Sequence, residues 1–441
     1  MRSSHSLDRI DTAFDDDRLV PDAGLILPAT LAHHLGLGGL VDEHLDLART
    51  AGRGNGGDKF LTLVMSALAG GDHIDHVDAL RAGGTGRVLG FGVKSASTVG
   101  TFLRSFTWGH VRQLDRVGRE LLARAWSAGA GPGAAPFTID LDSTICETYG
   151  LQKQGALHHG YTGVRGYHPL LAVAAGTGDV LMARLREGRA NTARGAAHFL
   201  AETIGRVRHA GATGQLTVRA DSGFYTHAVV ATSRRLQVRF SITVRQHKGL
   251  RTLIEAIPEH AWTPIPYWID GGADVAETSY TPFKGERDAV PVRLIVRRVR
   301  PTPGSQLSFF TTYDLHAFIT DRDGDMLTLE ADHRRHAEIE NAIRDLKHGV
   351  GLNHLPSGRF AANGAWLAAQ VMAHNVARWT ARIGLDEGIV TTKTIRRRFL
   401  GLPGRLTRSA RRVTLHLPAR WPWAAAFDMA LARLRALPLL T

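Results

Sequence analysis

The stretch FTIDLDSTICETYG, residues 137–150, places two carboxylates in a run that otherwise has the composition of a buried strand. Side chains alternate between the two faces of a strand, so Ile139 and Leu141 point to one face while Asp140 and Asp142 share the other. Two acids on one face need a metal ion, a base or a shared proton to offset their charge. The stretch therefore predicts a strand that carries part of a site.

The chain of 441 residues is basic, and its charge is unevenly distributed. It has 54 Lys and Arg against 41 Asp and Glu, a formal net charge of +13, which favours an acidic partner and most simply nucleic acid. Residues 393–441 contain ten Arg and one Lys against Asp428 alone, whereas residues 1–130 contain 14 basic and 15 acidic residues. Arg makes up 47 of the 54 basic residues, which bidentate phosphate contacts and GC-rich coding explain equally well.

The composition also limits the class of protein. With 44% hydrophobic and 22% charged residues, the chain can bury the cores of about two to four domains. The single cysteine, Cys146, excludes an internal disulfide framework and a Cys-rich zinc site. Residues 1–17 lack the apolar segment of a signal peptide, and no apolar run approaches about 18 residues. We therefore expect a cytoplasmic protein without a membrane partner.

Changes in sequence periodicity predict an α/β protein with five segments. Apolar residues three and four apart indicate helices early and late in the chain, and strand-like runs separated by one helix indicate an α/β layer between them. A proline-rich part with short alternating runs, such as residues 307–313, is typical of a β-rich insertion. The segments are a helical N-terminal region (1–130), a first core part (131–245), the β-rich insertion (246–325), a second core part (326–385) and a basic helical tail (386–441).

A second acid closes another strand-like run. Asp221 ends LTVRAD and is followed by a Ser-Gly turn. Acids at strand ends commonly belong to sites, because the loop exposes them while the strand fixes them. A helix N-cap for the segment that follows explains Asp221 equally well.

A third group of candidates lies in the predicted helix DHRRHAEIENAIRDLKHG, residues 332–349. Polar side chains three and four residues apart share one face beside an apolar stripe. A solvated face with ordinary intrahelical ion pairs gives the same pattern, so the spacing alone does not decide its role. The polar residues on this face are His333, His336, Glu340, Arg344 and Lys347.

Four motifs occur in order along the chain: DLDST, GLQKQGALHHGYTGVRGYHPLLA, VRADSGFY and HRRHAEIENAIRDLKHG. Together they resemble the Asp-Asp-Glu transposases of bacterial insertion sequences, in particular the insertion-sequence 1380 family, which is related to the insertion-sequence 4 group. The resemblance runs from about Leu25 to Ala381. It implies a ribonuclease H-like catalytic core, with a β-rich insertion between the second Asp and the Glu, in a cytoplasmic protein that associates with the bacterial nucleoid.

The resemblance also implies the site residues. Asp142, Asp221 and Glu340 take the catalytic and metal-binding positions for two Mg²⁺ or Mn²⁺ ions, and Asp140 is the alternative to Asp142. Hard divalent cations prefer oxygen ligands, which suits three carboxylates. The candidate DNA-binding residues are Lys347, Arg344, Lys153 and Arg165.

Two features of the chain leave alternatives open. In the wider group, the helix that carries the catalytic Glu has Tyr, Arg, Glu and Lys at the positions where this chain has His333, His336, Glu340 and Lys347. We expect both histidines to border the carboxylates and to donate to a phosphate or a metal-bound water; packing beside the strand of Asp142 is the alternative. A zinc triad of His333, His336 and Glu340 leaves DLDST unexplained. Trp262, in the insertion, either packs in a core or stacks on a DNA base.

The implied function is cut-and-paste transposition. The protein would bind the terminal inverted repeats of its element and the target as double-stranded DNA, as a homodimer in the complex, and would catalyse strand cleavage and strand transfer. Two alternatives remain: a ribonuclease H-like nuclease without strand transfer, and a catalytically dead, transposase-derived DNA-binding repressor.

Overall fold

The strand of the DLDST motif, β2 (Phe137–Ser143), lies inside a nine-stranded mixed sheet in the computed structural model of the chain. The structure describes residues 10–47, 50, 52–268, 272–300, 313–388 and 390–440. The strand order is β10-β11-β12-β13-β9-β8-β2-β6-β7. The other eight strands are β6 (Leu170–Ala174), β7 (Val180–Arg184), β8 (Leu216–Ala220), β9 (Arg239–Thr243), β10 (Thr263–Ile265), β11 (Ala273–Tyr280), β12 (Val292–Val299) and β13 (Asp314–Thr320).

The half of the sheet around β2 combines parallel and antiparallel pairs. β2 pairs parallel with β8, and β8 pairs parallel with β9, whereas β6 and β7 form an antiparallel hairpin beside β2. A turn at residues 176–179 joins this hairpin. Every residue of β6 and β8 is buried, as in a sheet covered on both faces. Helix α7 (Ala196–His209) packs on β6 and β7, and α8 (His227–Arg235) packs on β9.

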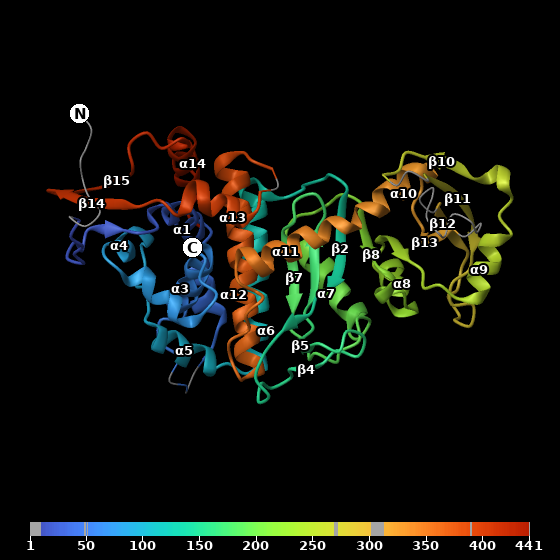
Figure 1. Cartoon of the computed structure of the whole chain (residues 1–441), viewed down its shortest axis with the longest axis horizontal. Helices are drawn as coiled ribbons and strands as arrows, with labels where there is room; N and C mark the ends of the chain where they lie inside the picture. The colour runs from blue at the N-terminus through green and yellow to red at the C-terminus, as the bar shows by residue number, and fades with distance from the viewer. Residues whose placement is uncertain are drawn as a thin grey trace.

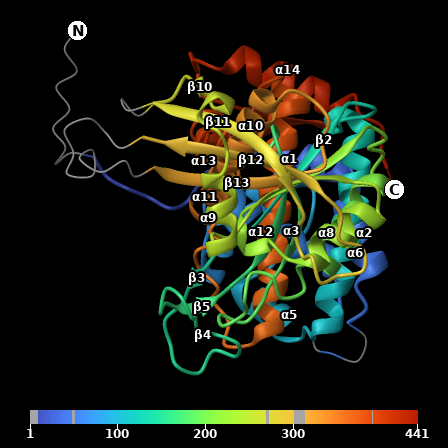
Figure 2. The ribbon, with the colours of Figure 1, turned by 90° about the vertical axis from the view of Figure 1, so that its right-hand side faces the viewer.

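The β-rich part continues the same sheet. Strand β13 pairs antiparallel with β9, so β10–β13 extend the sheet away from β2 and form one end of the molecule (Figures 1 and 2). Helix α9 (Lys248–Glu255) lies in this part. The predicted run at 307–313 lies outside the described residues, apart from Tyr313.

The opposite end of the molecule is helical. Helix α12 (Phe360–Trp379) packs against α3, α6 and β7, and it buries Trp366 and Trp379 as core residues. Among the described residues, no single helix is long and apolar enough to span a membrane; the bent pair Ala23–His34 and Leu37–His44 meets that test only jointly. The N-terminal helices are α1 (Ile26–His34), α2 (Leu37–His44), α3 (Gly56–Ala69), α4 (Thr85–Leu89), α5 (Ala96–Arg104) and α6 (Trp108–Ala125).

Two segments that the sequence predicts to be helical are not continuous helices in the structure. The basic tail is only partly helical, because β14 (Gly404–Ser409) and β15 (Arg412–His416) form a hairpin between α13 (Thr392–Ile395) and α14 (Ala424–Arg435). Alternation places Leu406 and Leu415 on one face of this hairpin, where they contact an apolar cluster, and burial of that face favours strands over a helix. The helix predicted at 332–349 is interrupted as well: α10 (Met326–Arg334) and α11 (Ile339–Gly349) are separated by a 3₁₀ turn.

A buried ion pair joins the central strands. Arg219 of β8 donates to Asp140 of β2 from Nε at 2.7 Å and from Nη2 at 2.8 Å, and each side chain is 1% exposed. Arg219 also donates to Asp332 of α10 through Nη1. This guanidinium therefore fixes β2, β8 and α10 relative to one another.

We expect Asp140→Ala to lower the free energy of unfolding by about 3 kcal/mol, because it leaves the Arg219 charge buried with only part of its compensation. Chemical denaturation of the purified protein measures this loss. Asp142→Ala is the matched control, since no cationic side chain forms an ion pair with Asp142 among the described residues. Equal stability of Asp140→Ala and the wild type would contradict the structural role of the pair.

Candidate active site

The strand register brings two of the predicted carboxylates side by side. Leu141 of β2 is paired with Ala220 of β8 in parallel register, so Asp142 and Asp221 each follow by one residue on neighbouring strands. Each carboxylate uses one oxygen locally: Asp142 Oδ1 accepts from the Ser143 amide at 2.6 Å, and Asp221 Oδ1 accepts from the Gly223 amide at 2.9 Å. The N-cap and site interpretations of Asp221 are therefore compatible, because its second oxygen is not used by the cap.

Helix α11 supplies the third carboxylate. Its apolar stripe, which includes Ile339, Ala342 and Leu346, is buried, while Glu340 lies in the first turn on the exposed side. The helix is held to β2 and to the loop after it by two bonds. His336 Nε2 donates to the Leu141 carbonyl at 3.1 Å, and Lys347 Nζ donates to the Ile145 carbonyl at 2.9 Å.

Asp221 and Glu340 lie near enough to Asp142 for their charges to act on its pKa. The pKa of Asp142 is raised to about 6, mainly by burial and also by the negative charges of Asp221 and Glu340, against the Ser143 amide and the nearby His336, which lower it. Charges act on a pKa in this way only over short distances. A cluster of carboxylates with unbalanced negative charge fits a divalent cation, which prefers such oxygen ligands.

Comparison with known proteins identifies the family. The model of the family Transposase DDE domain group 1 matches residues 3–439. The chain belongs to the DDE transposases. Such enzymes generally use divalent metal ions. Among solved structures, the transposase is similar to a piggyBac transposase synaptic complex with hairpin DNA, with 13% sequence identity, a TM-score of 0.42, and coverage of 86% of this chain and 79% of that chain. No curated protein matches the sequence.

Asp140 is not available as a ligand in this arrangement. Both of its carboxylate oxygens accept bonds from Arg219. Burial raises the pKa of Asp140, and the Arg219 guanidinium lowers it. The two acids that alternate on β2 therefore have different surroundings: Asp140 is neutralised inside the transposase, and Asp142 faces other carboxylates.

His333 does not border the carboxylates, contrary to our expectation from the helix spacing. Its Nδ1 lies 2.8 Å from Ser241 Oγ and its Nε2 lies 3.0 Å from Thr243 Oγ1, so both ring nitrogens bond to β9. The ring stacks on Phe318 at 4.0 Å between centroids, and burial lowers its pKa well below the usual value. The alternative zinc triad with His336 and Glu340 is not formed, because the 3₁₀ turn separates His333 from α11.

The predicted DNA-binding residues have unequal surroundings. Three of them donate to backbone carbonyls: Lys347 as described above, Lys153 to Leu355 at 2.7 Å, and Arg165 to Gly150 and Leu151. Arg344 is exposed on α11. These bonds give Lys347 and Lys153 a role in positioning the motifs around the site, and DNA contact remains a prediction for all four.

Trp262 lies at a cavity of about 520 Å³ in the β-rich part of the transposase. The Arg298 guanidinium lies 4.3 Å from the centre of the Trp262 ring and 4.7 Å from that of Tyr313. Arg298 also bonds to Asp274 and Glu259. Trp262 thus packs by a cation–π contact, and the open cavity beside it leaves base stacking as a prediction.

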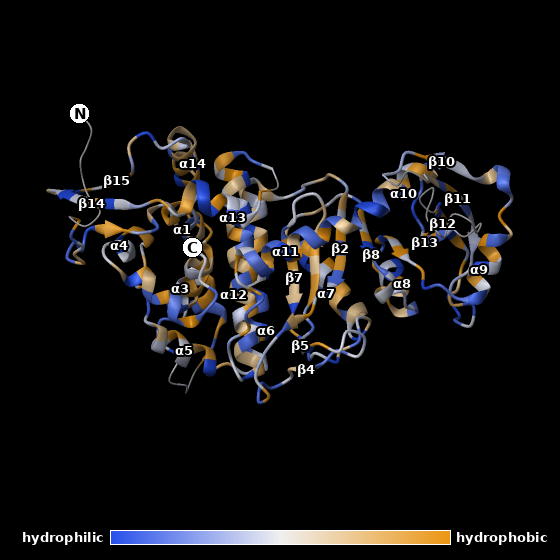
Figure 3. Cartoon of the chain, viewed as in Figure 1, coloured by the Kyte–Doolittle hydropathy of each residue, from blue (hydrophilic) through white to orange (hydrophobic). Residues whose placement is uncertain are grey.

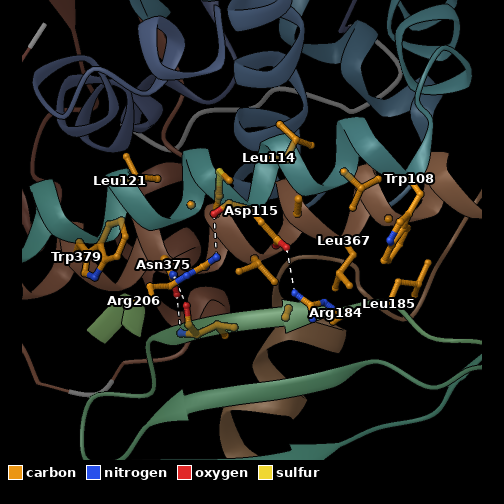
Figure 4. Close-up of a pocket in the computed structure, with 18 residues that line it drawn as sticks. Trp108, Leu114, Asp115, Leu121, Arg184, Leu185, Arg206, Leu367, Asn375 and Trp379 are labelled. Carbon is orange, nitrogen blue, oxygen red and sulfur yellow. Dashed lines mark hydrogen bonds and ion pairs between the residues drawn. The ribbon is translucent and has the colours of Figure 1, made fainter. Parts of the chain in front are cut away.

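Two further clusters of polar side chains were not predicted from the sequence. A crevice of about 40 Å³ separates α6, α12 and β7, where Asp115 meets Arg184 and Arg206 (Figure 4). The crevice has room for a few water molecules and is too small for a nucleotide. Its polar contacts therefore serve to join the helical end to the sheet. In the second cluster, Asp72, His73 and His76 place ligand atoms within 4.8 Å of one another. The spacing D-H-x-x-H was its only signal.

We expect His336→Ala to slow cleavage of an element end about five- to ten-fold at saturating DNA, because the lost bond to Leu141 loosens the link between β2 and the turn that precedes Glu340. His336→Gln keeps an amide donor and should retain more activity. A single-turnover cleavage assay measures both. The matched control is His348→Ala, an exposed imidazole on α11, which should cleave normally. Equal, near-normal rates in all three variants would remove His336 from the site.

Proposed function

We propose that the chain is the cut-and-paste transposase of an insertion sequence of the 1380 family, related to the 4 group. In this proposal the sheet around β2, β8 and β9 with α11 is a ribonuclease H-like core. The convergence of Asp142, Asp221 and Glu340 carries the proposal. The family match supports it, since the match extends over residues 3–439 and is not confined to one motif.

In the proposed reaction, each group has a defined part. Asp142, Asp221 and Glu340 hold two Mg²⁺ or Mn²⁺ ions, which stabilise the charge that develops on the attacking and leaving oxygens of a phosphodiester. The parallel pairing of β2 with β8 fixes the two Asp side chains, because the register aligns the strand ends and the Asp140–Arg219 pair holds that register one residue before the Leu141–Ala220 pair. His336 and Lys347 keep α11 against β2, so that Glu340 stays aligned with them.

The proposed partners are the terminal inverted repeats and the target DNA, bound by a homodimer. The net charge of +13 supports a polyanionic partner. Exposed Arg344, beside Glu340 on α11, is placed to meet a phosphate near the cleaved bond. A cytoplasmic, nucleoid-associated location belongs to the same proposal.

The two alternatives make different predictions. A dead repressor has no need of a buried carboxylate with two more carboxylates near it, so the surroundings of Asp142 argue against it. A nuclease without strand transfer uses the same carboxylates. Incubation with precleaved element ends and a target plasmid separates the two, because only a transposase joins the ends to the plasmid.

We expect Asp142→Ala, Asp221→Ala and Glu340→Ala each to lower cleavage at least about a hundred-fold while binding of the element ends persists, because the three groups hold metal and not DNA. Cleavage of a labelled duplex and a gel-shift assay measure the two properties. Glu338→Ala, which removes an exposed carboxylate just before α11, is the control. Cleavage by Asp142→Ala would exclude this site.

Metal binding can be tested without activity. We expect Mg²⁺ to raise the melting temperature of the wild type, because a ligand that binds the folded state stabilises it and because the ions relieve repulsion among the carboxylates. Asp142→Asn should melt higher than the wild type without Mg²⁺ and should lose the Mg²⁺-dependent increase. Differential scanning calorimetry measures this. An identical Mg²⁺ response of the wild type and the variant would show that the ions bind elsewhere.

A further inference from the structure

The hairpin β14–β15 forms a ribbon that is anchored only at its base. Strand β1 (Leu19–Val20) pairs with Arg405 and Gly404, and Leu406 packs against Val20 and Ala23. Beyond these residues, the two strands pair with each other alone among the described strands. Figure 1 shows the ribbon projecting at the end of the molecule opposite β10–β13.

One face of the ribbon is polar along its whole length. Cross-strand partners share a face, and the pairs Arg405–His416, Thr407–Thr414 and Ser409–Arg412 contain no apolar side chain. Residues 404–416 contain four Arg and no Asp or Glu. The outer end of the ribbon is strongly hydrophilic (Figure 3).

The charges at the outer end are not balanced within the protein. Arg405, near the base, forms an ion pair with Asp16 at 3.3 Å. Arg408, Arg411 and Arg412 are exposed, and no acidic side chain pairs with them in the part of the chain that the structure describes. A projecting element with three such cations is suited to a polyanion.

Other cations of the tail are already engaged. Arg396 donates to the carbonyls of Leu68 and Ala67, and burial lowers its pKa. Arg398 lies over the Trp423 ring at 5.6 Å. These two cations are therefore less available to an outside partner than the three exposed ribbon arginines.

We propose that the β14–β15 ribbon lies in a groove of duplex DNA, with Arg408, Arg411 and Arg412 on the phosphates beside it. This rests on the proposed function, in which DNA is the substrate. The major groove, about 12 Å wide, admits a two-stranded ribbon, and the polar face offers the hydroxyl groups of Thr407, Ser409 and Thr414 toward it. A lipid surface would favour apolar side chains at the tip, where Val413 is the sole large one among residues 408–413.

The position of the ribbon defines its contribution. It projects from the helical end, whereas the carboxylates lie on the central strands β2 and β8 and on α11 (Figure 1). The ribbon thus contacts duplex DNA away from the cleaved bond. It should raise affinity for DNA without taking part in the chemical step.

The test compares Arg411→Gln/Arg412→Gln with Arg420→Gln/Arg435→Gln in the full-length protein. The control pair has the same charge change and removes two exposed tail arginines outside the ribbon. Binding to an element-end duplex and to an unrelated duplex is measured over a range of salt concentrations. We expect the ribbon variant to bind both about ten-fold more weakly, with a slope of log affinity against log salt smaller by about 1.8. The control should change affinity less than two-fold, and both variants should cleave at the wild-type rate at saturating DNA.

A contact map gives a second readout. Cys146 is buried, so Ser409→Cys introduces a single accessible thiol on the polar face for a photo-crosslinker. We expect crosslinks to the duplex from Ser409→Cys and not from Ala432→Cys on α14. Crosslinking from neither position would overturn the ribbon proposal.

The remaining outcomes separate the two proposals. Equal losses in the two double variants, or no loss in either, would overturn the ribbon as a distinct DNA contact. The ribbon proposal would also be overturned if the ribbon variant lost binding to vesicles of anionic lipid while its DNA binding stayed unchanged. Normal cleavage by Asp142→Ala would remove the proposed active site and leave the ribbon result standing, whereas a wild-type protein that binds no duplex would overturn both.

Discussion

The register between β2 and β8 is the constraint on which the site depends. A shift of one residue would turn every side chain of a strand to the opposite face, so the parallel alignment must be held firmly. The Asp140–Arg219 pair, one residue before the Leu141–Ala220 pair, provides that hold from inside the sheet. Because Arg219 also reaches Asp332 on α10, the same guanidinium orients the segment that leads to Glu340. One buried cation thus positions elements that carry all three carboxylates.

The two acids of DLDST have different roles although they lie on one strand: one forms an ion pair within the fold, and the other belongs to the candidate site. They lie on the same face, two residues apart, yet only Asp140 has a cation to balance it. Asp142 is buried and lies near the charges of Asp221 and Glu340, which makes its ionised form costly. Folding does not benefit from such repulsion, and a site that binds cations does.

The elements that could be predicted from the sequence are those set by patterns over a few neighbouring residues. The strand at 137–143, the hairpin around residues 176–179 and the helix at 196–209 follow from alternation and periodicity over a few residues. The join between β9 and β13 could not be predicted, because it pairs residues more than 70 positions apart. The break before α11 was missed for a related reason. His333 is drawn to Ser241 and Thr243 on β9, and tertiary bonds of that kind override the helical spacing.

The sequence could not show which charged side chains are paired within the fold and which are free to bind a partner. The tail contains ten Arg, but the count does not show that Arg396 is used on backbone carbonyls or that Arg405 is paired with Asp16. The fold buries or pairs some of these cations and leaves others, including those at the tip of the ribbon, exposed without an acidic partner among the described residues. The carboxylates are sorted by the same rule, since Asp140 is neutralised and Asp142 is not. Unbalanced charge of opposite sign therefore lies on separate parts of one protein: negative where metal ions would bind, and positive where a duplex would be held.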